Sequence, residues 1–340
     1  MTVWHSWLAA LLALSSGAAA LGRPPIIDMH LHARRAGPIG PDAPALCAPP
    51  TTMPRWDNAR PLAQGLSQDE RPCAHPLQPS ASGEQVMRGT LAVMERRNVI
   101  GMASGEPEDI ARWRAAAPER IVAGLDLRIV PRPPSARFQA RSPEEVRALH
   151  AAGAFEVLGE VMAQYEGVAP DDARLGPYWA LAEELEIPVA IHLGPGSAGA
   201  PYEGGAYRAR NSSALGLEEV LVRHPRLRVY IMHAGYPLID DLLALLFAHP
   251  QVYVDIAAIV ATEPRPAFHR FLQRIVEAGH GDRVMFGTDQ GIWPELIEVA
   301  IRTIEQAPFL SARQKRDILY NNAARFLRLT PAQIARHHAM

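Results

Sequence analysis

Two histidines separated by one residue, His30 and His32, end a short apolar run that begins at Ile26. Side chains alternate between the faces of a β-strand, so the two imidazoles would point the same way. Two imidazoles on one strand face can converge on a single cation. The same spacing also occurs among hydrogen-bonded core histidines, so the pair alone leaves both interpretations open.

Four further side chains able to bind a metal each stand at the end of a separate apolar run. They are Glu160, His192, His233 and Asp289. A charged or imidazole group after a buried run is costly unless it is paired or bound to a metal. Its repetition at four positions favours one shared metal site over chance.

The elements that must position these residues alternate regularly from residue 26 onward. Apolar runs rich in Val and Ile, typical of strands buried on both faces, cover Ile26–His32, Val99–Ser104, Ile121–Arg128, Phe155–Met162, Pro188–Gly194, Arg228–Gly235, Val252–Ala258 and Val284–Asp289. Helix-like stretches cover Gln85–Arg97, Pro107–Ala116, Pro143–Ala152, Pro177–Leu185, Gly216–Arg223, Leu238–Phe247, Arg265–Ala278 and Pro294–Gln306.

Eight such alternations predict an α/β fold of the (β/α)8 TIM-barrel type, whose active site lies at the carboxyl ends of the strands. A doubly wound open sheet is the alternative, but no glycine-rich dinucleotide loop supports it. With 340 residues, 48% of them apolar, the chain can bury one large core as a single domain. The helical tail Ser311–Leu329 is expected to pack on the barrel.

The net charge of −2 gives no electrostatic case for nucleic acid or an acidic membrane surface as a partner. Residues 1–20 resemble a cleaved signal peptide, with a short apolar run from Trp7 to Leu14 followed by small residues. We therefore expect an exported protein, periplasmic or secreted, whose single barrel domain covers residues 21–340. A buried N-terminal helix is the alternative.

The segment 33–83 interrupts the alternation and holds many of the 31 prolines. It leaves the carboxyl end of the first strand, where long loops commonly serve active sites. We interpret it as a lid insertion. Its two cysteines, Cys47 and Cys73, are the only ones in the chain, and in an exported protein they predict a disulfide worth about 3 kcal/mol.

The motifs at these strand ends resemble the amidohydrolase superfamily, and more closely its amidohydrolase-2 branch. The resemblance covers residues 26–329 and is carried by DMHLH at 28–32, IHLG at 191–194, MHAGYP at 232–237, FGTD at 286–289 and NNAARFL at 321–327. It implies that a divalent metal, usually zinc, is held by His30, His32, His192 and Asp289. It also implies that His233 binds a second metal or polarises the substrate.

Many members of this superfamily bridge two metals with a carbamylated lysine, but the only lysine of this chain is Lys315, far past the strands. Some branches use a glutamate at this position instead, and Glu160 matches that pattern. The resemblance therefore allows either two metal ions bridged by Glu160 or one metal ion that Glu160 supports. Asp28 and Asp255 are expected to support the site. Branch members often form dimers, so a homodimer is an expectation that no residue here marks.

The resemblance implies hydrolysis of an amide, ester or lactone bond by metal-activated water, with Asp289 moving the proton and His233 stabilising the oxyanion. Non-oxidative decarboxylation of an aromatic or unsaturated acid is the alternative, since some branch members catalyse it. Several arginines near the strand ends favour a small carboxylate-bearing substrate, although they could also be solvated. The candidate substrate contacts are Arg34, Arg128, Tyr165, Tyr236 and Trp293.

Overall fold

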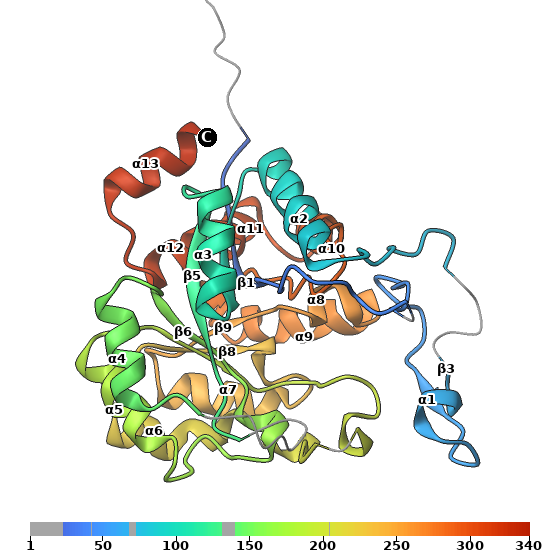
Figure 1. The fold of residues 1–340 in the computed structure, drawn as a ribbon, viewed down its shortest axis with the longest axis horizontal. Helices are drawn as coiled ribbons and strands as arrows, with labels where there is room; N and C mark the ends of the chain where they lie inside the picture. Colours follow the sequence, from blue (N-terminus) through green and yellow to red (C-terminus); the bar gives the residue numbers. More distant parts are fainter. Residues whose placement is uncertain (1–22, 42, 68–72, 131–139, 204) are drawn as a thin grey trace, which may run out of the picture.

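A computed structural model describes residues 23–41, 43–67, 73–130, 140–203 and 205–340. Its main sheet consists of eight parallel strands that follow one another in chain order (Figure 1). They are β1 (Ile26–His32), β4 (Val99–Gly105), β5 (Ile121–Leu127), β6 (Val157–Val161), β7 (Val189–His192), β8 (Val229–Met232), β9 (Tyr253–Asp255) and β10 (Val284–Met285). Each predicted apolar run forms one of these strands, so the TIM-barrel prediction is confirmed. The predicted signal peptide lies outside the described residues.

The barrel closes just beyond the last strand. The Met29 N–H donates to the Phe286 carbonyl at 2.9 Å, and the Asp289 N–H donates to the His30 carbonyl at 2.8 Å. The carboxylate of Asp28 strengthens this seam, because it accepts from the Thr288 N–H at 3.0 Å and from the Thr288 hydroxyl at 2.6 Å. Closure therefore occurs beside the residues predicted to bind the metal.

Helices surround the strands, as Figure 1 shows. The eight predicted ones are α2 (Gly83–Arg97), α3 (Pro107–Ala116), α4 (Pro143–Ala151), α5 (Gly176–Glu184), α6 (Glu218–Arg223), α7 (Ile239–Ala248), α9 (Arg265–Glu277) and α10 (Leu296–Glu305). Their predicted ends agree to within about two residues, the usual uncertainty of helix boundaries. None of the helices in the described part of the chain is long and apolar enough to cross a membrane.

The C-terminal tail is helical, as predicted, and plugs the amino-terminal end of the barrel. It consists of α11 (Ala312–Arg316), a π-helical turn η7 (Asp317–Asn321) and α12 (Asn322–Phe326). Tyr320 and Phe326 join Ile27, Met29 and Tyr230 in a buried apolar cluster. A second, larger cluster of buried apolar side chains lies between the strands and the outer helices.

Outside the insertion, two α-helices of the described part of the chain were not predicted. The short α8 (Ile259–Thr262) follows β9, and α13 (Pro331–Ala339) ends the chain. No residue of α13 is buried. Its start is set by a capping box, in which Thr330 and Gln333 satisfy each other's backbone N–H groups.

The insertion after β1 contains α1 (Leu62–Gly65) and a small hairpin of β2 (Arg55–Trp56) and β3 (Leu66–Ser67). The predicted disulfide is confirmed, with the Cα atoms of Cys47 and Cys73 5.8 Å apart.

We expect the buried face of α9 to carry far more stability than the exposed face of α7. Phe268→Ala should lower the free energy of unfolding by about 3–5 kcal/mol, because Phe268 is fully buried between helix and barrel. Phe247→Ala is the matched control and should change it by less than about 0.5 kcal/mol, because Phe247 is 84% exposed. Urea denaturation of both variants checks this, and equal losses would contradict the packing described.

Candidate metal centre

The histidine pair at the end of β1 points into the barrel mouth. The His30 and His32 ring centroids are 5.1 Å apart. The pairing of β1 with β4 shifts register between Asp28 and Leu31, so simple face alternation does not hold across that stretch. The two imidazoles nevertheless approach the same acidic groups, because Glu160 Oε2 lies 3.7 Å from Nε2 of each.

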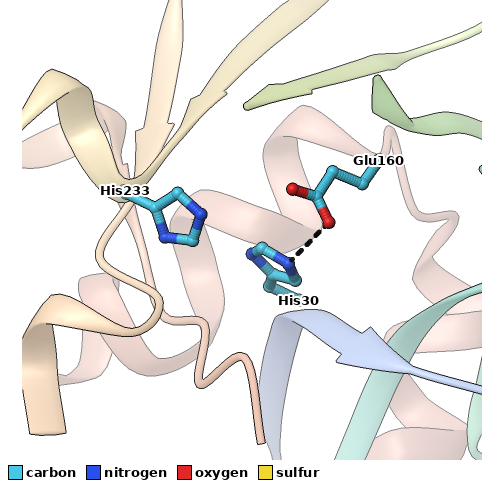
Figure 2. A group of neighbouring side chains, drawn as sticks. All are labelled: His30, Glu160 and His233. Carbon is cyan, nitrogen blue, oxygen red and sulfur yellow. Dashed lines mark ion pairs between the residues drawn. The ribbon is translucent and has the colours of Figure 1, made fainter. Parts of the chain in front are cut away.

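Glu160, His192 and His233 come from the ends of three neighbouring strands, β6, β7 and β8. His192 Nδ1 lies 2.7 Å from Glu160 Oε1 and 3.0 Å from His233 Nε2. All three residues are buried. Figure 2 shows Glu160 and His233 on two sides of the His30 ring, with the Glu160 carboxylate directed at it.

Asp289 completes the group from the segment that follows β10. Its Oδ1 lies 2.8 Å from His32 Nε2 and 3.9 Å from His30 Nε2. The Asp289 backbone is left-handed, with φ of 54°, and His233 has a similar φ of 61°. Left-handed residues other than glycine are strained by about 1–3 kcal/mol and collect at functional sites.

Two overlapping trios of potential metal ligands result, each with its donor atoms within 4.8 Å of one another. One trio is His30, Glu160 and His233, and the other is His30, His32 and Asp289. His192 adjoins the first trio through Glu160 and His233. All six residues singled out in the sequence therefore meet in one connected cluster.

The hydrogen bonding of this cluster fits a divalent cation. Within the described part of the chain, both ring nitrogens of His30 are buried without a hydrogen-bond partner. The Nδ1 of His233 lies 2.9 Å from the Ala257 carbonyl, which can only accept, so Nδ1 carries the proton and Nε2 offers a lone pair. That lone pair, His192 Nδ1 and Glu160 Oε1 lie side by side, and a cation would satisfy all three.

The electrostatics also fit a cation. Burial favours a neutral Glu160, but the neighbouring His192 and His30 outweigh it and hold the Glu160 pKa well below its usual range. Burial likewise acts on Asp289, but His30 and His32 lower its pKa to about 2. Burial, together with His192 and His30, lowers the pKa of His233 to about 4. At neutral pH both carboxylates are thus ionised and His233 is neutral, the forms in which these groups bind metals. Burial favours a neutral His30, but Asp289, Asp255 and Glu160 raise the His30 pKa well above its usual range, so a bound cation would displace the His30 proton.

Two buried aspartates hold the ligands in place, as predicted for both. Asp255 accepts the His233 N–H at 2.8 Å, and its other oxygen lies 3.5 Å from His30 Nδ1. Asp28 accepts the His30 N–H at 3.0 Å, so it orients the backbone of that residue rather than its ring. Burial raises the Asp28 pKa to about 7.

Two supporting residues were not anticipated from the sequence. Asp126 of β5 accepts the Glu160 N–H at 3.2 Å, and an acidic residue between two leucines of an apolar run was the available signal. Gln164 donates to the Gly194 carbonyl and accepts the Gly194 N–H, both at 3.0 Å, which fixes the backbone that follows β7. No local pattern marks Gln164.

Of the candidate substrate contacts, Tyr165 lies closest to the cluster, with its ring centroid 4.3 Å from that of His192. Arg128 follows β5 and is partly buried near Glu166. The other three make contacts outside the cluster. The Tyr236 hydroxyl donates to Glu263, and the Trp293 indole N–H donates to the Pro44 carbonyl. Arg34 is exposed, and its backbone carbonyl accepts a hydrogen bond from the Arg112 side chain. Their role in binding substrate stays a prediction.

A family model described as "Amidohydrolase" matches residues 27–329. The chain belongs to the amidohydrolase family. Membership supports an enzyme, and together with the donor set it supports a divalent metal. Protein fluG of Emericella nidulans is 25% identical to this amidohydrolase over 132 residues, which are 33% of this chain and only 15% of that protein.

Solved structures share the barrel. An uncharacterised TIM-barrel protein of Bordetella bronchiseptica has a TM-score of 0.55 at 20% identity, over 76% of this chain and 88% of its own. A probable 2-pyrone-4,6-dicarboxylic acid hydrolase of Acinetobacter baumannii has a TM-score of 0.57 at 13% identity, over 89% of this chain and 99% of its own. The 5-carboxyvanillate decarboxylase of Sphingomonas paucimobilis has a TM-score of 0.50 at 17% identity, over 71% of this chain and 82% of its own. Identities this low establish the common fold alone.

We expect Asp255→Asn to weaken metal binding about 10–100-fold while the protein stays folded. An amide would turn either its carbonyl or its NH2 group toward His30 Nδ1, and the ring would lose its ionic partner. Competition with a chelator, followed by elemental analysis, measures the effect. Asp240→Asn is the control, because the Asp240 side chain is 82% exposed on α7. Equal affinity in Asp255→Asn and Asp240→Asn would contradict the role of Asp255.

Proposed function

We propose that this amidohydrolase is a metal-dependent hydrolase that cleaves an amide, ester or lactone bond in a small carboxylate-bearing substrate. The observation that carries the proposal is the position of Asp289. Its side chain is 28% exposed, whereas those of His30 and Glu160 are almost completely buried. Asp289 is thus an ionised carboxylate that faces the mouth at the edge of a buried cluster of ligands.

His30, His32, His192 and Asp289 would hold the metal, for which zinc is the proposed ion. A bound divalent cation supplies positive charge that polarises a carbonyl and makes water more acidic. Glu160 belongs to one trio of donors and also approaches the other, because its carboxylate lies 3.7 Å from His30 and from His32 and 2.7 Å from His192. That central position suits a bridge between two ions, and it also suits a supporting carboxylate beside one.

The side chains divide the remaining work. Asp289 would accept a proton from the attacking water at its carboxylate and return it to the leaving group. His32, 2.8 Å from Asp289 Oδ1, orients that carboxylate. The proton on His233 Nδ1 is already committed to Ala257, so the geometry supports His233 as a ligand better than as a donor to the oxyanion. Arg128, at the end of β5, would pair with the substrate carboxylate.

The insertion 33–83 would act as a lid over this site. Two observations support that role. The ring of Trp56 in β2 packs on Tyr202 in the loop after β7, with centroids 5.0 Å apart. The insertion also contacts the loop after β10, because the carbonyl of Pro44 accepts a hydrogen bond from the indole N–H of Trp293 in that loop. The insertion is therefore attached to loops on two sides of the mouth.

A decarboxylase of aromatic or unsaturated acids is the second candidate. The same ligands can serve both reactions, and barrels of this shape occur in proteins described as a 5-carboxyvanillate decarboxylase and as a probable 2-pyrone-4,6-dicarboxylic acid hydrolase. Incubating the metal-loaded enzyme with lactones, amides and aromatic acids separates them. We expect hydrolysis products without carbon dioxide; stoichiometric carbon dioxide release would favour the second candidate.

Asp289→Asn should lower turnover by about 10²–10⁴-fold, the range for loss of a general acid–base residue. The fold should survive, because asparagine tolerates the left-handed backbone required at this position. Steady-state kinetics and thermal unfolding of the variant measure both effects. The exposed Asp282→Asn serves as control, and wild-type turnover in Asp289→Asn would refute the assignment.

We further propose that the protein is exported to the periplasm or secreted. The Cys47–Cys73 disulfide supports this, because such bonds persist in oxidising compartments. Expression in a bacterial host with a secretion pathway should yield a mature chain that begins near Leu21, as mass spectrometry of the purified protein would show. An intact N-terminus retained in the cytoplasm would contradict export.

A further inference from the structure

A groove of about 470 Å³ lies at the amino-terminal end of the barrel, opposite the metal centre. It is bordered by the residues that precede β7, β8 and β9 and by the end of α12. Its lining consists of Glu186, Pro225, Arg226, Leu227, Arg228, Pro250, Gln251, Tyr253, Arg325, Phe326 and Arg328. Its volume is within the range of small-molecule sites.

The charge of this groove is strongly unbalanced, with four arginines and a single glutamate among its lining residues. Among the described residues, only Arg328 of these four arginines forms an ion pair, with Glu186. The partly buried Arg228 donates to the carbonyls of Glu186 and Phe326 and has no carboxylate partner within the described residues. Burial and the charge of Arg328 lower the Arg228 pKa.

The other two arginines also lack an acidic partner in the groove. Arg325 donates to the Asp282 carbonyl and to the Asn322 side chain. The exposed Arg226 makes its one hydrogen bond in the described part of the chain through its backbone N–H, to Glu183. Four guanidinium groups, two before β8 and two in or just after α12, thus border one cavity that has a single carboxylate, that of Glu186, among its described lining residues, and an anion would relieve their repulsion.

The backbone at the edge of the groove is strained. Glu186 and Arg328 have φ of 54° and 56°, although neither is glycine. Their ion pair joins the turn before β7 to the residues after α12. Such strain is retained where the surrounding structure requires a fixed geometry.

From these observations we propose that the groove binds a small organic dianion, one that carries a phosphate or two carboxylates. The partly buried Tyr253 ring, which packs on the buried Phe326 ring with centroids 5.1 Å apart, would give the groove an apolar side for the ligand body. Guanidinium groups bind both phosphate and carboxylate in a two-point manner. The site is separate from the metal centre, so it does not depend on the proposed reaction.

Calorimetric titration of the full protein with inorganic phosphate and with phthalate, at ionic strength held constant with chloride, tests this proposal. We expect saturable binding of at least one of them, and which one binds distinguishes the phosphate from the dicarboxylate. Arg226→Gln and Arg328→Gln should each weaken it about tenfold. Arg313→Gln should leave it unchanged, because the Arg313 side chain is 92% exposed on α11, outside the groove lining. Thermal unfolding without the anion verifies that each variant is folded.

Three results would overturn the proposal. The first is no saturation by either anion up to about 10 mM. The second is equal binding by Arg226→Gln, Arg328→Gln and Arg313→Gln, which would place the anion elsewhere. The third is sedimentation with phosphatidylglycerol vesicles that Arg226→Gln abolishes while neither small anion binds, which would assign the groove to a lipid surface.

Discussion

Four imidazoles and two carboxylates meet at the mouth of the barrel, and this arrangement constrains the rest of the structure. His30, His192, His233 and Glu160 are buried, whereas His32 and Asp289 are partly exposed. Removing such groups from water is costly unless opposite charge compensates it. Asp255 supplies part of the compensation, since its Oδ2 lies 3.5 Å from His30 Nδ1, while Asp28 fixes the backbone by accepting the N–H groups of His30 and Thr288. A divalent cation would supply the remainder.

This constraint accounts for the irregular upper half of the barrel. The strands are regular where they carry apolar side chains, and the last three span only two to four residues. Beyond them the chain adopts left-handed backbone at His233 and Asp289. At the opposite end of the barrel, Phe326 and its neighbours form a buried apolar cluster. The side chains that stabilise the barrel there are thus separated in space from the candidate metal ligands.

The sequence predicted all eight strands, because parallel strands buried on both faces appear as continuous apolar runs. It also predicted the six clustered donors, since each ends such a run. The register shift of β1 depends on pairing with β4 and has no local pattern. The directions of Tyr236 and Trp293 depend on Glu263 and Pro44, which are distant in sequence, so no local pattern could give the contacts of these two side chains.

X-ray absorption spectroscopy of the purified protein at the metal edge tests the central claim most directly. If the cluster holds a divalent cation, the spectrum should show nitrogen and oxygen neighbours at about 2.0–2.2 Å with several imidazole rings, a pattern lost in a His30→Ala, His192→Ala double variant. A protein that retains no stoichiometric cation, or a spectrum unchanged in that variant, would contradict it.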